Sequence, residues 1–218
     1  MHLTHPDEEP VLWTDDLAEA RLQQLGLPGS APLRRAIHAG SAAARAVNSD
    51  HPVSYRGYRM FGETVEMLRK QLRPAGWDKD DLENIPLVVH RADPVVMIAV
   101  APGDGSTGSL NQKSGPMLRY PKGPFSTKFY NGDLDDLWSR AEGNPYEVWL
   151  LVHHIYGLSV RSELSKPIHL DDAGQVTGWH ERIVLPELGF DPEPRRLDTP
   201  ERPPTREIVP DVRLRDVG

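Results

Sequence analysis

Cysteine is absent from this chain, which excludes disulfides and thiolate-ligated metal sites and suits a reducing compartment. No apolar run reaches the length that a membrane helix requires. The first residues, MHLTHPDEEP, lack the basic and apolar regions of a signal peptide. We therefore expect a cytoplasmic protein with no membrane partner.

Aromatic residues make up only 7% of the 218 residues, and lysine and arginine are outnumbered by acids, 25 to 32. The formal net charge of −7 argues against a protein that coats duplex nucleic acid through general positive charge. The excess of acids is too small for a nucleic-acid mimic. In contrast, the 21 prolines and 18 glycines are plentiful and indicate many turns and stretches of extended backbone.

Apolar spacing in the first third of the chain predicts three helices. They cover DDLAEARLQQLG from residue 15, APLRRAIHAGSAAARAV from residue 31 and YRMFGETVEMLRKQLR from residue 58. Gly40 weakens the middle of the second helix because glycine is a poor helix former. The third helix has the clearest apolar stripe, with Met60, Val65 and Leu68 on one face.

After the third predicted helix the sequence contains short runs rich in valine and isoleucine, which predict strands. A first pair covers residues 85–91 and 94–102, and a meander covers residues 146–156, 158–165 and 175–186. In the second strand of the meander, alternation places Val160 and Leu164 inward and Glu163 outward. A short helix is expected around DLDDLWSRAE, which begins at residue 133.

These elements predict an α+β fold in which N-terminal helices pack on a mostly antiparallel sheet, with a Pro-rich C-terminal extension. The predicted organisation is a flexible N-terminal lead at 1–13, a single α+β domain at 14–188 and a Pro-rich extended tail at 189–218. No motif identifies a family.

The segment from Gly103 to Gly108 matches the G-x-G-x-x-G pattern of dinucleotide-binding proteins. That motif requires a helix that opens on its last glycine, but the following residues, SLNQKSGPMLRYPKGPF, are broken by glycine and proline. The dinucleotide interpretation therefore fails. A looser alternative is a nest of backbone amides that holds an anion, built from Gly103, Gly105, Ser106 and Thr107.

Residues 105–132 contain no acid, although they lie in an acidic chain. Cations and aromatic rings alternate there, which is the combination that single-stranded nucleic acid or a nucleotide requires. The candidate binding residues of this loop are Lys113, Arg119, Tyr120, Lys122, Lys128 and Tyr130.

A second basic-aromatic stretch, SYRGYRMFGE, begins at residue 54 and contributes Arg56 and Arg59 as further candidate binding residues. It joins the loop in one surface if the third helix packs beside the loop. Otherwise its rings serve to fix the start of that helix.

Histidines and carboxylates near the C-terminal sheet suggest a metal site as another alternative. The possible ligands are His154, Glu163, His169, Asp171, Asp172 and His180. No H-E-x-x-H motif, nucleophile elbow or other catalytic constellation is present.

The sequence thus predicts a non-enzymatic contact module with a protein partner and no cofactor, which acts through the loop at 103–130 and a possible contribution from the tail. Two alternatives stay open: a binder of single-stranded nucleic acid or a nucleotide through the same loop, and a metal-dependent hydrolase at the C-terminal histidines and carboxylates.

Overall fold

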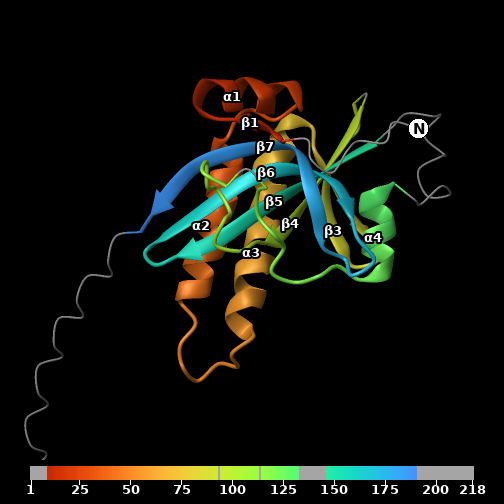
Figure 1. Cartoon of the computed structure of the whole chain (residues 1–218). Coiled ribbons are helices and arrows are strands. Elements are labelled where there is room, and N and C mark those ends of the chain that lie inside the picture. Colours follow the sequence, from red (N-terminus) through yellow and green to blue (C-terminus); the bar gives the residue numbers. More distant parts are fainter. Residues whose placement is uncertain (1–8, 93, 113, 133–145, 191–218) are drawn as a thin grey trace, which may run out of the picture.

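The computed structural model describes residues 9–92, 94–112, 114–132 and 146–190. Helices α1 (Asp15–Gln24), α2 (Ala31–Arg45) and α3 (Tyr55–Leu72) precede most of the strands and pack on one side of a seven-stranded sheet (Figure 1). The chain therefore has an α+β fold, as the sequence predicts.

The sheet has the strand order β1-β7-β6-β5-β4-β3-β2. Its strands are β1 (Val11–Trp13), β2 (Asp78–Leu82), β3 (Ile85–His90), β4 (Val95–Pro102), β5 (Tyr146–Tyr156), β6 (Ser159–Leu170) and β7 (Val176–Gly189). The predicted pair β3–β4 and the predicted meander β5–β6–β7 are both antiparallel. The pairs β4–β5 and β1–β7 are parallel, so the sheet is mixed but mostly antiparallel.

The helical layer forms the larger core. Met60, Val65 and Leu68 of α3 lie in one apolar cluster with strand residues such as Ile98 and Trp149. The stripe predicted for the third helix is therefore confirmed. A 3₁₀ turn, η1 (Arg73–Ala75), and the left-handed Gly76 end that helix where the sequence predicts it.

The opposite face of the sheet is covered by the segment that joins β4 to β5. This segment contains a short helix, α4 (Pro124–Asn131), whose Phe129 belongs to a second apolar cluster with Leu118 and Val152. The sequence predicts only a loop here. Proline at the first helical position and glycine on either side fit a short helix, but eight residues carry too little periodicity to predict it.

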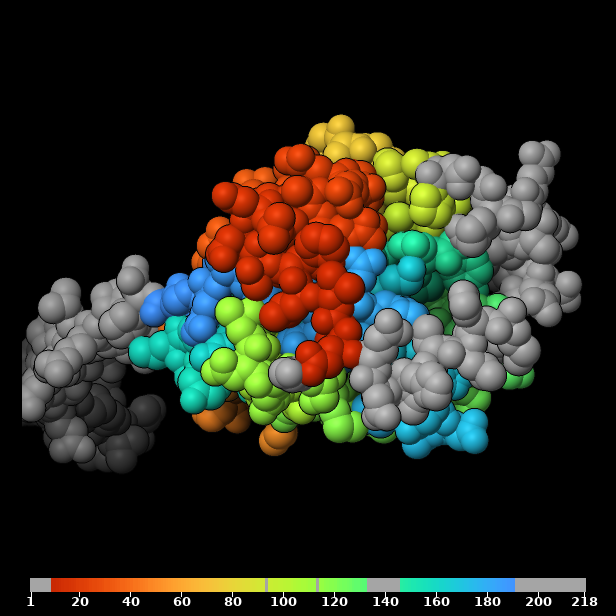
Figure 2. All heavy atoms as spheres, turned by 45° about the horizontal axis from the view of Figure 1, so that its top comes forward, coloured from red at the N-terminus to blue at the C-terminus, as the bar shows by residue number. Residues whose placement is uncertain are grey.

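Strands β1 and β2 are absent from the predicted elements, because runs of three and five residues are too short to show a period. Strand β1 lies within the predicted flexible lead, where its three residues pair with β7 next to α1 (Figure 2). Strand β2, with sequence DKDDL, has no apolar alternation and pairs with β3 at the edge of the sheet. The helix predicted around residues 133–142 and the tail from residue 191 lie outside the described residues.

Helices α2 and α3 form an antiparallel hairpin that projects beyond the sheet (Figure 1). They approach closely at Gly40, where an added Cβ would meet Thr64 Oγ1 and the carbonyl oxygen of Met60. Across the described part of the chain, no helix combines the length and the apolar character needed to cross a bilayer.

Candidate functional site

The glycine-rich segment after β4 is a closed turn whose amides donate within the chain. Gly103 N donates to His153 O at 2.9 Å, Asp104 N donates to Met117 O at 3.0 Å, and Thr107 N donates to Asp104 O at 3.1 Å. Ser106 directs both its amide and its hydroxyl at Asp104 Oδ1, at 3.0 and 2.5 Å. These donors are all used within the protein, and Gly105 is the exposed residue of the segment from Gly103 to Gly108.

The anion that this turn contacts is a carboxylate of the protein itself. Gly108 N donates to Glu163 Oε2 at 2.8 Å, and Ser165 Oγ donates to Glu163 Oε1 at 2.8 Å. Glu163 is fully buried. The sequence places it outward, but the face it points to is covered by the loop and not by solvent. Its burial is a correction to the alternation argument.

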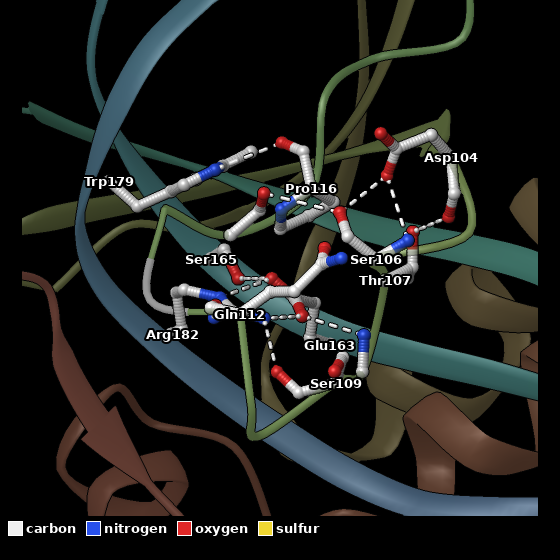
Figure 3. Close-up of polar contacts among 12 residues, drawn as sticks. Asp104, Ser106, Thr107, Ser109, Gln112, Pro116, Glu163, Ser165, Trp179 and Arg182 are labelled. Atoms are coloured by element: carbon white, nitrogen blue, oxygen red, sulfur yellow. Dashed lines mark hydrogen bonds and ion pairs between the residues drawn. The ribbon is translucent and has the colours of Figure 1, made fainter.

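Arg182 neutralises Glu163 and completes the structure that we call the Glu163–Arg182 anchor (Figure 3). Its Nε and Nη2 donate to the two carboxylate oxygens at 3.0 and 2.7 Å. The same guanidinium donates to Gln112 O at 2.8 Å and to Ser109 O at 3.2 Å. The anchor therefore fixes the loop to β6 and β7 from beneath.

A second set of contacts holds the loop farther along. Trp179 Nε1 donates to Pro116 O at 3.0 Å, and Gly115 has a left-handed φ of 72° that lets its backbone lie against the indole. Gln175 Nε2 donates to Leu118 O at 3.1 Å, and Lys122 N donates to Gly174 O at 2.9 Å. Hydrogen bonds thus hold the described residues of the loop against the sheet, and the outward side chains extend from this backbone.

Those outward side chains form the contact surface, which we define as Met117, Arg119, Tyr120, Lys122 and Lys128. Met117 and Tyr120 are large side chains with 52% and 62% of their surface exposed. The Arg119 guanidinium lies 5.8 Å from the centre of the Tyr120 ring. Within the described residues, none of the three cations forms an ion pair.

Lys122 is the most enclosed of these cations. Its ammonium lies 6.0 Å from the centre of the Tyr130 ring, and burial lowers the pKa of Lys122 from its ordinary value. Tyr130 itself is packed in the core, where burial raises the pKa of its hydroxyl. The structure therefore separates the predicted aromatic residues into an exposed Tyr120 and a buried Tyr130. Lys113 lies outside the described residues.

The second predicted basic-aromatic stretch stands on another side of the molecule. Arg56 and Arg59 belong to the first turns of α3, whose core residues pack on the helical face of the sheet, whereas Leu118 and Phe129 pack on the opposite face. Arg59 is paired with Glu63 at 2.9 Å. The sheet thus lies between α3 and the loop, and the two stretches do not merge into one surface.

Several of the histidines and carboxylates proposed as metal ligands contact other groups of the protein instead. His154 Nδ1 lies 3.1 Å from Gly103 O, His169 Nε2 lies 3.4 Å from Asn131 Nδ2, and Glu163 belongs to the anchor. No group of three potential ligands converges among the residues that the structure describes.

His153, which precedes His154 in β5, is a buried polar residue. It shares the helical face of β5 with Trp149 and Leu151 and is paired in register with Ser162 of β6. Neither His153 Nδ1 nor Ser162 Oγ has a hydrogen-bond partner in the described structure. Burial, assisted by the charge of His154, lowers the pKa of His153 from 6.5 to about 4.

This pKa predicts an acid-dependent loss of stability. Below pH 6.5 the unfolded chain binds a proton at His153 that the folded chain excludes until about pH 4, so unfolding becomes more favourable across this interval. Between pH 7 and pH 5 the free energy of unfolding should fall by about 2 kcal/mol through this residue. Denaturant titrations of the wild type and His153→Leu at both pH values measure this contribution.

The His153→Leu variant should lose less stability on acidification than the wild type. His169→Gln removes an exposed histidine from the neighbouring strand and is the matched control. Equal pH dependence of the wild type and His153→Leu would show that His153 is not the group responsible.

We compared the chain with protein-family models, with curated proteins and with solved structures. None of the three comparisons finds a significant match.

Proposed function

We propose that this protein is a non-enzymatic binding module that recognises an acidic protein partner through the contact surface. The observation that carries the proposal is the state of its cations: Arg119, Lys122 and Lys128 have no carboxylate partner among the described residues of a chain whose net charge is −7. Acids on a partner would supply the missing counter-charges and guide the encounter.

The exposed apolar side chains favour a protein over a nucleic acid. Methionine, tyrosine and arginine are enriched in protein interfaces, and Met117, Arg119 and Tyr120 lie within four consecutive residues around Leu118, which forms an isolated β-bridge with Gly103. A groove for single-stranded nucleic acid needs successive exposed rings for stacking. Here Phe129 and Tyr130 are buried, which leaves Tyr120 as the exposed ring of the contact surface.

The rigidity of the loop supports the same proposal. The backbone of the contact surface is held at Leu118 O by Gln175 and at Lys122 N by the carbonyl oxygen of Gly174. A backbone held in this way loses little conformational entropy when it binds, so a small number of side chains is sufficient for useful affinity.

Tyr120→Ala is expected to weaken partner binding by about 30-fold and Arg119→Ala by about tenfold, as is typical of aromatic and arginine residues at the centre of interfaces. Quantitative affinity capture from cell extract, followed by calorimetry with the purified partner, measures both effects. Tyr58→Ala is the control because Tyr58 is 70% exposed and lies on the helical hairpin, away from the contact surface.

The proposal is overturned if the partner captured by the wild type is retained equally by Tyr120→Ala and Arg119→Ala. Fluorescence anisotropy with labelled oligo(dT) tests the alternative ligand: salt-sensitive binding that both variants lose would replace a protein partner with single-stranded nucleic acid. Capture that depends only on residues 191–218, tested by their deletion, would move the function to the tail.

A further inference from the structure

A cavity of about 490 Å³ lies between α1, β1 and the strands β6 and β7, and its lining includes Trp179, which also donates to Pro116 O of the loop. This volume is within the range of small-molecule sites. Its lining includes Trp13, Arg21, Gln24, Lys166, Ile168 and Glu181. Figure 2 shows the face on which α1 and β1 lie over β7.

The carboxylates around the cavity have donors from within the protein. Glu181 accepts hydrogen bonds from Trp13 Nε1 at 2.9 Å and from Arg21 Nε and Nη2, each at 2.7 Å. Glu147 forms an ion pair with Lys166 Nζ at 2.9 Å and accepts a hydrogen bond from Trp149 Nε1 at 3.2 Å. Glu9 and His180, which also line the cavity, make further contacts of their own.

Arg21 and Lys166, in contrast, have N–H donors that the hydrogen bonds and ion pairs above do not use. An ammonium has three N–H donors and a guanidinium five. Lys166 contacts one carboxylate oxygen, and Arg21 uses one further donor on Gln24 Oε1 at 3.1 Å. The amide nitrogen of Gln24 adds neutral donors at the same wall. The remaining hydrogen-bonding capacity of Arg21, Lys166 and Gln24 is therefore that of a site for hydrogen-bond acceptors.

The shape of β7 brings its side chains to this wall. Lys166 is opposite Glu181 and Pro167 is opposite Trp179, so His180 is an extra residue in β7, a β-bulge. Bulges redirect side chains and recur beside binding sites. Because of the bulge, the side chain of Glu181 points toward α1, whereas that of Trp179 points toward the loop on the opposite face of the sheet. The cavity lies beside this bulge, and both residues line it.

We propose that the cavity binds a small organic anion, a carboxylate or a phosphate monoester that carries a planar apolar group. The anionic oxygens would accept hydrogen bonds from Lys166 and Arg21, and the apolar group would lie against Trp13 and Ile168. None of the contact-surface residues lines the cavity, and this proposal does not rest on the function proposed for that surface.

Titration with phenyl phosphate and with benzoate tests the proposal in the full chain. Both probes should bind saturably and shift the indole N–H signal of Trp13 in NMR spectra. Inorganic phosphate, which lacks the ring, and benzyl alcohol, which lacks the charge, should bind at least tenfold more weakly. The absence of saturable binding of both anions at millimolar concentration overturns the proposal, and so does binding of benzyl alcohol as strong as that of the anions.

Two substitutions should change the affinity in opposite directions. Lys166→Met removes the ammonium and should weaken binding of the aromatic anions about tenfold or more, since a hydrogen bond to a charged group is lost. Glu147→Gln removes the carboxylate that competes for Lys166 and should strengthen binding several-fold. A structural role of Lys166 alone would not produce this opposite change.

Lys70→Met is the matched control because Lys70 also pairs with a glutamate, Glu66, but stands on the exposed face of α3. It should leave the affinity unchanged. Equal affinity of Lys166→Met and Lys70→Met, or weaker binding by a folded Glu147→Gln, would contradict the assignment of the site.

Discussion

Arg182→Met is expected to lower the free energy of unfolding by about 3–5 kcal/mol, because it leaves the buried carboxylate of Glu163 without its counter-charge. It also removes the donors to the carbonyl oxygens of Ser109 and Gln112. For a chain of this size the loss corresponds to a decrease in Tm of about 10 °C. Calorimetry and denaturant titration measure it.

Two further variants separate the buried pair from ordinary ion pairs. Arg161→Met breaks a pair with Glu187 whose side chains are 31% and 46% exposed, and it should cost less than about 1 kcal/mol. The double variant Glu163→Gln with Arg182→Met leaves no buried charge and should recover part of the stability. A loss for Arg182→Met no larger than that for Arg161→Met would mean that the anchor does not stabilise the fold.

Gly40→Ala is expected to destabilise the protein by about 3 kcal/mol, although alanine is the better helix former by about 1 kcal/mol. The reason is the close approach of α2 and α3: the new methyl group would meet Thr64 Oγ1 and the Met60 carbonyl oxygen, and the latter belongs to backbone that cannot turn away. Thermal unfolding followed by circular dichroism measures the change.

Gly62→Ala is the matched control for helix propensity. Gly62 lies within α3, has no neighbour within 4 Å of an added Cβ, and should gain about 0.5–1 kcal/mol on substitution. The two glycine variants should therefore change stability in opposite directions. If both stabilise the protein, the helices of the hairpin are farther apart than the structure places them.

Gly40 also shows where prediction from the sequence reaches its limit. Local periodicity is sufficient to find α3 and the meander, because their apolar residues repeat over many positions. The same local reasoning takes Gly40 as a weak point in a helix. Its role depends on a neighbouring helix that local spacing does not describe.

The loop was more predictable in its chemistry than in its packing. The lack of acids between residues 105 and 132 points to Arg119, Lys122 and Lys128, the loop cations for which no ion pair is found among the residues that the structure describes. Burial of Tyr130 could not be predicted, because its position on α4 depends on contacts with β6. Met117 was missed because a single methionine between turn residues has no pattern around it.

The sequence gives a weak indication that Glu163 and Arg182 lie close together. Glu163 and Arg182 lie at equal distances in sequence from the turn at residues 171–174, so a regular hairpin would bring them together. Bulges in β6 and β7 shift the pairing, and Glu163 is opposite Val184 while Arg182 is opposite Ser165. Long side chains bridge this diagonal. The cavity residues Arg21 and Lys166 left no such signal, since they come from distant elements.

The parallel pairing of β4 with β5 limits how far the connection between these two strands can be shortened. Two neighbouring parallel strands cannot be joined by a tight turn, so the chain must travel back along the sheet before β5 begins. The connection after Pro102 is therefore an obligatory crossover, and shortening it would prevent β5 from taking its place in the middle of the sheet. Evolution or design could exchange the outward side chains of this crossover to alter recognition, provided that the connection stays long enough to return to the start of β5.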